Sequence, residues 1–373
     1  MPDTIPTIVL VGENDTQIWG MSIDERTRRM AAAAKIPFGG AEGGAAALLV
    51  NRAFVFDPPW LAYHAQAPGA VLTIAGVPVI AHVRDAAERA RVAAAMAERR
   101  PLGDPGALLV TAYEDGATIV NEALRKRERP FAMPLRPDTV KAAERASYFG
   151  AYKGVTDLLT KYLWPEWALL LTRLAARIGM TPNQVTMLGA ALCVVATFAF
   201  WRGHYWLGMA MGLVFMVLDT VDGKLARCTI TSSWWGNVFD HGIDLVHPPF
   251  WWWAWGVGLT AYGRPIAQGT LWTLLAVIIG CYVLQRLVEG AFLRLYGMHI
   301  HVWRKFDSDF RLITARRNPN MVILFASMLF GRPDTGLIAV AWWTAISLVV
   351  HLVQLVQAML AHARGREIRS WLA

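Results

Sequence analysis

The chain has 373 residues, of which 55% are hydrophobic and 17% are charged, whereas soluble domains typically contain about 25% charged residues. This balance excludes a disordered chain and argues against an ordinary soluble enzyme. The net charge of +8 suits a protein that lies beside anionic lipid headgroups or handles phosphorylated substrates. Nucleic acid is not expected as a partner, because the basic residues lie between apolar segments rather than in one patch.

Residues 1–148 show short β-rich runs that alternate with helix-like stretches. This alternation predicts an α/β domain with a parallel, Rossmann-like sheet and crossover helices. Strands are expected at residues 7–11, 46–50, 71–80 and 107–111, helices at 24–34, 85–99, 120–127 and 138–147, and loops at the glycine-rich run 39–44 and at 100–106. The first residues carry no basic segment before their short apolar run, so no signal peptide is expected.

The second half of the chain has the pattern of a membrane domain. Residues 165–178 are amphipathic, which predicts a helix lying in the membrane interface. The apolar stretches that follow approach the roughly 20 residues needed to cross a bilayer. Six spans are expected, at residues 184–201, 206–225, 238–259, 271–292, 320–330 and 337–361, the fifth being short. The predicted organisation is a cytoplasmic domain (1–148), a linker with the interfacial helix (149–180) and an α-helical membrane domain (181–373).

The distribution of Lys and Arg predicts the orientation of these spans. The first, third and fifth connections carry only Arg202, Arg264 and Arg332, whereas the other connections and the C-terminal end are rich in basic residues. Basic residues concentrate on the cytoplasmic side of bacterial inner membranes and of other membranes. Both termini are therefore expected in the cytoplasm, with the chain in the cytoplasmic (inner) membrane.

Four aspartates lie where the second predicted span ends and the third begins. Asp219 and Asp222 are three residues apart and share one helix face. Gly236, Asp240 and Asp244 recur at every fourth residue and form one stripe on the next helix. A short polar link between the helices would let them lie antiparallel, so the two acidic surfaces are expected to face each other.

The charge of this cluster needs a partner. An Asp at the centre of a membrane helix costs about 2.5–3.5 kcal/mol, and clustered carboxylates repel one another and take up protons. Lys224 and Arg227 supply only two of the cations required. Two divalent metal ions would supply the rest, and all-oxygen ligation favours Mg²⁺ or Mn²⁺. Such paired sites typically hold phosphate oxygens. The alternatives are a transporter or channel that uses the aspartates as an ion pathway, and a non-catalytic scaffold.

The pattern D-x2-D-G-x2-A-R-x8-G-x3-D-x3-D at residues 219–244 matches the signature of the CDP-alcohol phosphotransferases at every fixed position. The chain resembles this family from about Tyr148 to its C-terminus, and residues 181–186 (TPNQVT) are similar to the family's PNxxT element. The resemblance implies transfer of a substituted phosphoryl group from a CDP-alcohol to an acceptor hydroxyl, with release of CMP.

The same resemblance implies roles for individual residues. Asp219, Asp222 and Asp240 would hold two metal ions, and Asp244 would complete the second metal site and act as the general base on the acceptor hydroxyl. The nucleotide would be bound by Asn183, Thr186, Asp219, Gly223, Ala226 and Arg227. Family members with a phosphorylated acceptor keep a basic pocket near the metals, for which the candidates are Lys153, Arg173, Arg286, Arg316 and Arg317. Each of these basic residues is also explained by snorkelling or by the positive-inside rule.

Residues 1–148 resemble the nucleotidyltransferase domain of fused inositol-phosphate cytidylyltransferase–phosphotransferase proteins. The first strand runs into Gly12-Glu13-Asn14-Asp15, whose carboxylates would repel a triphosphate. The domain is therefore expected to be inactive, the alternative being a cytidylyltransferase that makes the CDP-alcohol. Inositol-phosphate chemistry is preferred for the membrane domain; phosphatidyl transfer from CDP-diacylglycerol and a ceramide-type acceptor are alternatives. Trp-rich faces could also form the contact of a homodimer.

Overall fold

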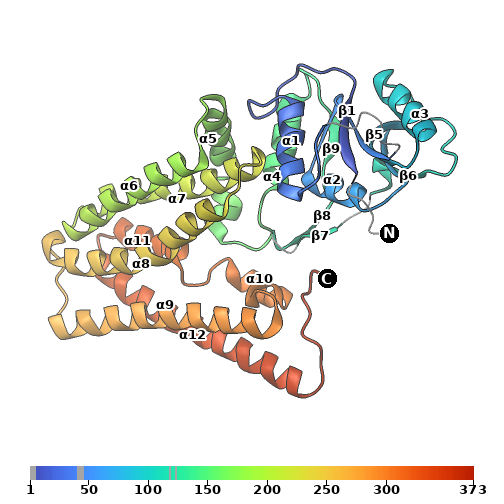
Figure 1. Ribbon diagram of the computed structural model, residues 1–373. Helices are drawn as coiled ribbons and strands as arrows, with labels where there is room; N and C mark the ends of the chain where they lie inside the picture. Colours follow the sequence, from blue (N-terminus) through green and yellow to red (C-terminus); the bar gives the residue numbers. More distant parts are fainter. Residues whose placement is uncertain (1–5, 40–45, 117–118, 122–123) are drawn as a thin grey trace.

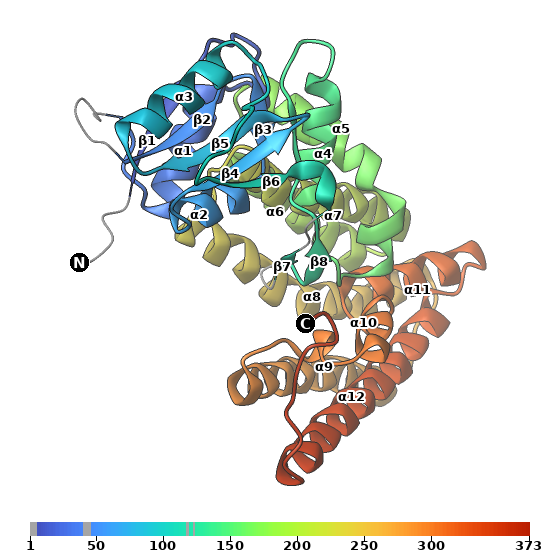
Figure 2. The same ribbon diagram turned by 90° about the vertical axis from the view of Figure 1, so that its right-hand side faces the viewer.

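The computed structural model describes residues 6–39, 46–116, 119–121 and 124–373. An α/β domain lies at one end of a set of long helices, most of which run side by side (Figure 1 and Figure 2). The helical half confirms the α-helical class expected for residues 181–373, and the first half confirms the expected α/β class. The glycines at positions 40, 43 and 44 lie outside the described residues.

The N-terminal sheet has the strand order β1-β2-β5-β4-β6. Its strands are β1 (Thr7–Val11), β2 (Ala47–Asn51), β4 (Ala70–Ile74), β5 (Val77–Val83) and β6 (Leu109–Ala112). The pairs β1–β2 and β4–β6 are parallel, whereas β2–β5 and β4–β5 are antiparallel. The sheet is therefore mixed, and the prediction that all its strands are parallel is wrong. Residues 71–80 contain a turn at Ala75 and Gly76, both with positive φ (49° and 77°), a geometry that matches a hairpin rather than one long strand.

Three of the four predicted helices of this domain are present: α1 (Ile23–Ala34), α3 (Ala86–Ala97) and α4 (Val140–Gly150). The prediction of a helix at residues 120–127 is wrong for the part that the structure describes. There β7 (Ile119–Asn121) and β8 (Lys126–Glu128) form an antiparallel pair. Helix α2 (Pro58–Ala65) was not predicted from the sequence, nor was the antiparallel pair of β3 (Phe54–Phe56) with β9 (Ala132–Pro134).

The helical half contains a helix at each predicted position. Helix α5 (Pro165–Arg177) matches the amphipathic segment. The six predicted spans correspond to α6 (Pro182–Trp201), α7 (Tyr205–Cys228), α8 (Trp234–Tyr262), α9 (Gln268–Tyr296), α11 (Arg317–Leu329) and α12 (Pro333–Ala363). Short helices lie at Tyr113–Asp115, Leu159–Leu163, Ile300–Val302 and in α10 (Lys305–Arg311).

Within the described residues, four of these helices, α6, α7, α9 and α12, are long and apolar enough to cross a membrane. Helix α11 has 13 residues, about 20 Å of helix at 1.5 Å per residue, against a hydrocarbon core of about 30 Å. Helix α8 is long but carries two aspartates of the motif and two internal prolines. The chain thus has the helices of a multi-pass membrane protein, and four of the six predicted spans meet both criteria.

The prolines of α8 leave backbone carbonyls without their usual partner, because proline has no N–H. Pro249 would have bonded the Leu245 carbonyl, which instead accepts a hydrogen bond from the Tyr282 hydroxyl of α9 (3.1 Å). His247 bonds the Ile243 carbonyl through Nδ1 (2.7 Å) and packs against aromatic rings. His247 thus serves packing in α8.

The α/β domain is joined to the helices that carry the aspartates. Ile18 and Trp19 belong to the same buried hydrophobic cluster as Trp164 and Val221. From α1, Arg26 Nη1 donates to the Cys228 carbonyl and Arg29 Nη1 to the Thr229 carbonyl, both at 2.9 Å. A guanidinium at a helix C-terminus complements the helix dipole. The end of α7 is therefore capped by the N-terminal domain.

Candidate active site

One cavity of about 1130 Å³ brings together nearly all the residues singled out from the sequence. Its walls include residues of α6, α7, α8, α9, α11 and the linker after α4, together with Leu124 and Arg125, which directly precede β8. Of the predicted site residues, it is lined by Lys153, Asn183, Thr186, Asp219, Asp222, Gly223, Ala226, Arg227, Asp240, Asp244, Arg286, Arg316 and Arg317. Arg173 is not among them: it pairs with Glu144 of α4 at 2.8 Å. Arg173 therefore joins the two domains and lies outside the cavity that the other candidates line.

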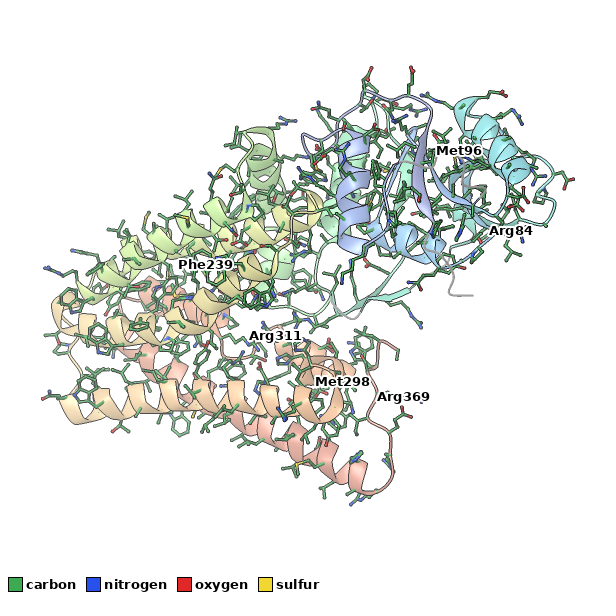
Figure 3. The ribbon with its side chains drawn as sticks, in the orientation of Figure 1. Arg84, Met96, Phe239, Met298, Arg311 and Arg369 are labelled. Atoms are coloured by element: carbon green, nitrogen blue, oxygen red, sulfur yellow. The ribbon has the colours of Figure 1, made fainter. Side chains whose placement is uncertain are left out.

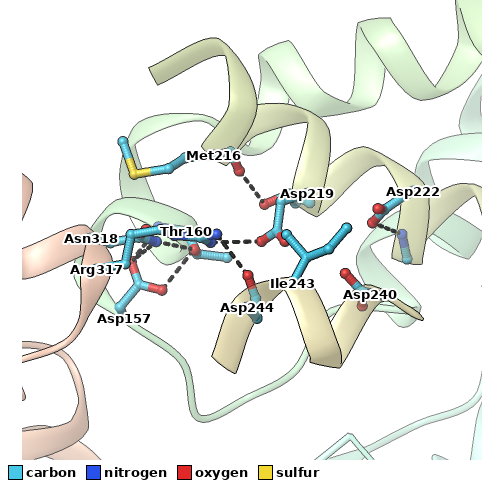
Figure 4. A network of polar contacts seen from close by, with 12 residues as sticks. Asp157, Thr160, Met216, Asp219, Asp222, Asp240, Ile243, Asp244, Arg317 and Asn318 are labelled. Atoms are coloured by element: carbon cyan, nitrogen blue, oxygen red, sulfur yellow. Dashed lines mark hydrogen bonds and ion pairs between the residues drawn. The ribbon is translucent and has the colours of Figure 1, made fainter. Parts of the chain in front are cut away.

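The two acidic helix surfaces face each other, as their spacing predicts (Figure 4). Between them lies Arg317, the first residue of α11. Its Nη2 is 2.8 Å from Asp219 Oδ2, and its Nη1 is 2.7 Å from Asp244 Oδ1. Arg317 was assigned to the acceptor pocket from the sequence, but here it links two aspartates of the motif.

Arg317 is itself held by a hydrogen-bonded chain that starts in the linker (Figure 4). Its Nε donates to Asn318 Oδ1 at 2.9 Å, and Asn318 Nδ2 donates to Asp157 Oδ1 at 3.0 Å. Thr160 also donates to Asp157 (2.8 Å). Burial raises the pKa of Asp157, but the Arg311 guanidinium and these hydrogen bonds outweigh that effect and leave the pKa below its usual value. An ionised Asp157 thus holds Arg317 in place through Asn318.

The other two aspartates differ in their surroundings. Asp222 is buried and accepts a hydrogen bond from Thr186 Oγ1 of α6 at 2.6 Å. Asp240 accepts no hydrogen bond from a described residue, and Nδ1 of His241 lies 3.8 Å from its Oδ2. Gly236, on the same stripe, lies against α6: a Cβ there would be 3.0 Å from Asn183 Oδ1. The glycine therefore lets the two helices approach at the mouth of the cavity.

A basic region surrounds Glu289 of α9 and adjoins the cluster of four aspartates. Arg286 Nη2 lies 2.7 Å from Glu289 Oε1, and Arg316 Nη2 lies 2.5 Å from Glu289 Oε2. His301 Nε2 is 3.2 Å from the same carboxylate. Arg311 is buried beside this group with its Nε and Nη1 unpartnered among the described residues; Figure 3 shows it near the middle of the molecule.

Glu289, His301 and His351 lie close enough together to hold a metal ion. Two guanidinium groups already neutralise this carboxylate, however, and a divalent cation placed there would be repelled by both. The region therefore suits an anion better. Glu289 and His301 were not predicted as site residues from the sequence, although an acidic residue within an apolar span signals a functional site.

The linker adds a further positive charge to the basic region. Burial lowers the pKa of Lys153 to about 8, and the nearby Arg125 and Arg227 lower it in the same direction. Burial also lowers the pKa of Arg125 to about 10, with Arg316 as the like charge beside it. Like charges of this kind gather where an anion is bound.

Comparison with known proteins gives one family match and several similar proteins. Residues 179–308 match the family model described as CDP-alcohol phosphatidyltransferase. Cholinephosphotransferase 1 of Gallus gallus is 37% identical over 131 residues, which cover 31% of this chain and 37% of that protein. Phosphatidylinositol phosphate synthase of Streptomyces avermitilis is 34% identical over 93 residues, which cover 24% of this chain and 38% of that protein. The chain thus spans less than half the length of these two relatives.

Among solved structures, that of Mycobacterium tuberculosis phosphatidylinositol phosphate synthase with CDP-DAG bound is similar to this chain with a TM-score of 0.40 and 18% sequence identity. The similarity covers 50% of this chain and 92% of that one.

Proposed function

We propose that this chain transfers a substituted phosphoryl group from a CDP-alcohol to an acceptor hydroxyl and releases CMP. The first support is that residues 179–308 match the CDP-alcohol phosphatidyltransferase family. The observation that carries the proposal is the convergence of Asp219, Asp222, Asp240 and Asp244 on one cavity from two adjacent helices. A transporter would use the same residues as an ion pathway, but it would leave the adjacent basic region without a function.

Proteins of this family use divalent metal ions, and the residues of the cavity fit such ions. Carboxylate oxygens are the ligands that Mg²⁺ and Mn²⁺ prefer, and Asp240 accepts no hydrogen bond from a described residue. Asp219, Asp222, Asp240 and Asp244 would hold two ions. Bound there, the ions would neutralise the diphosphate and stabilise the departing CMP.

The side chains of the cavity would divide the remaining work. Arg227, on the same helix as Asp219 and Asp222, would bind the diphosphate of the donor. Asp244 would accept the proton of the acceptor hydroxyl as the new phosphoester bond forms. Thr186 fixes the carboxylate of Asp222 through its hydrogen bond, and an oriented ligand loses less entropy when substrate binds.

The acceptor is proposed to carry a phosphate group, as in inositol-phosphate chemistry. The support is the basic region: Lys153, Arg286 and Arg316 line the cavity next to the aspartates. CDP-diacylglycerol is the second candidate for the donor, from which a phosphatidyl group would be transferred to such an acceptor. The matched relatives include a protein named phosphatidylinositol phosphate synthase. A ceramide-type acceptor would leave these cations unused.

The N-terminal domain is proposed to be non-catalytic. The segment after β1 is occupied by contacts within the chain: Asn14 Nδ2 donates to the carbonyls of Arg52 and Leu135 at 2.8 and 2.9 Å. Arg52 in turn pairs with Asp24. The side chains that would meet a triphosphate here are thus engaged in holding the fold. The positive-inside pattern further supports placing this domain on the cytoplasmic side of the membrane.

The proposal is tested by incubating the purified full-length protein with CDP-linked donors and with phosphorylated or lipid acceptors, with Mg²⁺ or Mn²⁺ and with a chelator. Metal-dependent CMP release is expected. Asp244→Asn should abolish transfer while donor binding survives, and Asp309→Asn is the control because Asp309 is exposed and pairs with Lys305. Ion flux without CMP release would favour a transporter, and full activity of Asp244→Asn would remove this residue from the mechanism.

A further inference from the structure

The N-terminal domain supplies two residues, directly before β8, to the wall of the cavity. Leu124 and Arg125 line the cavity alongside residues of the membrane helices. Arg125 adopts a left-handed backbone conformation with φ 53°, which non-glycine residues rarely adopt without a local reason. This strained residue presents a basic side chain to a site made by a different domain.

The linker to the membrane domain holds residues 124–126 in place. Gly154 N donates to the Leu124 carbonyl at 2.8 Å, and Lys126 Nζ donates to the Gly150 carbonyl at 2.6 Å. A Cβ on Gly154 would lie 2.6 Å from the Arg125 carbonyl oxygen and 2.6 Å from Lys126 Cβ. Only glycine permits this approach. The position of Arg125 is therefore set by the contact of residues 124–126 with the linker.

The surroundings of Arg125 are basic. Its side chain makes no hydrogen bond or ion pair with a described residue. Arg316 is the nearby like charge, and Glu289 is the nearby opposite charge, but Glu289 is already paired with Arg286 and Arg316. Arg311, buried on the same wall, lies near the Asp157 carboxylate, but its Nε and Nη1 have no hydrogen-bond partner among the described residues. Buried guanidinium groups of this kind normally have anionic partners.

We propose that Arg125 is an acceptor-binding residue that the N-terminal domain supplies in cis, and that it binds the phosphate group of the acceptor together with Arg311. The inference rests on the proposed phosphotransferase function. It gives the non-catalytic domain a direct part in substrate selection: without Arg125, the membrane domain lacks one cation of its anion site.

The test compares full-length wild type with Arg125→Gln, Arg125→Lys and the control Arg127→Gln, which removes an exposed charge from β8. With myo-inositol 1-phosphate as the acceptor probe, Arg125→Gln should raise the acceptor KM about tenfold, since a charge-assisted hydrogen bond is worth at least about 1.4 kcal/mol. The donor KM and kcat should stay near wild type, and Arg125→Lys should restore part of the affinity. Arg127→Gln should change none of these values.

Two further measurements keep the inference independent of activity and of folding defects. Inorganic phosphate, titrated in a thermal-shift assay without donor, should stabilise wild type more than Arg125→Gln. Gly154→Ala should weaken phosphate binding by displacing Arg125, whereas Gly280→Ala, where a Cβ meets nothing within 4 Å, should not. Unchanged acceptor KM and phosphate binding in Arg125→Gln, or a rise in donor KM instead, would overturn the assignment. If wild type released no CMP with any substrate pair, the proposed function would fail, and the phosphate titration would still decide the role of Arg125.

Discussion

Arg317 contacts Asp219 and Asp244 at the same time, at 2.8 and 2.7 Å, so that one residue of α11 joins the acidic surfaces of α7 and α8. The guanidinium lies among the carboxylates that the proposed metal ions would use. A cationic side chain and a divalent ion cannot both take the same oxygens without strong repulsion. Arg317 must therefore move, or share these aspartates, when metal binds.

The first prediction follows from this competition. Arg317→Gln should bind Mn²⁺ or Mg²⁺ more tightly than wild type, by about threefold or more, because the metal no longer displaces an ion pair. The increase in melting temperature with metal concentration measures this affinity. The control is Arg316→Gln, which removes the neighbouring charge but leaves the aspartates untouched, since Arg316 pairs with Glu289. Equal or weaker metal stabilisation of Arg317→Gln would show that the arginine does not compete.

A second prediction concerns the hydrogen bond from Thr186 to Asp222, 2.6 Å long and buried. Removing a residue that orients a metal ligand typically lowers metal affinity or activity by about 10–100-fold. Thr186→Val should therefore raise the metal concentration needed for half-maximal CMP release by about tenfold or more, and Thr186→Ser should recover most of it. Thr197→Val is a suitable control, because Thr197 bonds only a backbone carbonyl of its own helix. Identical metal titrations for Thr186→Val and wild type would argue against a metal on Asp222.

The third prediction is a pH dependence. Burial and two neighbouring arginines lower the pKa of Lys153 to about 8, so its ammonium group is present below that pH and is lost above it. The KM for a phosphorylated acceptor should therefore rise as the pH passes through about 8, whereas an ordinary lysine would lose its charge only above about 10. Lys153→Arg should remove this rise, because arginine stays protonated. A flat profile between pH 7 and 9 in the wild type would exclude Lys153 from acceptor binding.

The motif of residues 219–244 was predictable from the sequence because its members repeat at helical spacing and belong to neighbouring helices. Their facing arrangement follows from two local helices and one short link. The role of Arg317 was not predictable, since it contacts residues 98 and 73 positions away in the sequence. Such contacts depend on how α11 packs, and no periodicity in one helix specifies that.

The N-terminal domain shows the converse case, in which local preference was misleading. Residues 120–127 contain Glu, Ala, Leu, Arg and Lys, which favour helix on their own. The described part contributes to an antiparallel strand pair, and Leu124 and Lys126 are held by hydrogen bonds to Gly154 and Gly150. Tertiary contacts outweigh a helix propensity of a few tenths of a kcal/mol per residue. The same contacts carry Arg125 into the cavity, so the error in secondary structure also concealed a candidate binding residue.

The last prediction tests whether the N-terminal domain supports the active helix. Arg26 is buried on α1 and donates to the carbonyls of Cys228 (2.9 Å) and Phe56 (3.4 Å). Arg26→Ala leaves these buried acceptors unpaired, at about 1–3 kcal/mol each, and should lower the free energy of unfolding and raise the donor KM by loosening the end of α7. Arg28→Ala on the same helix, an exposed residue paired with Glu25, should change stability by no more than about 0.5 kcal/mol. Thermal unfolding together with donor kinetics measures both effects. A loss of stability without any change in donor KM would mean that the domain is attached to α7 but does not shape the nucleotide end of the site.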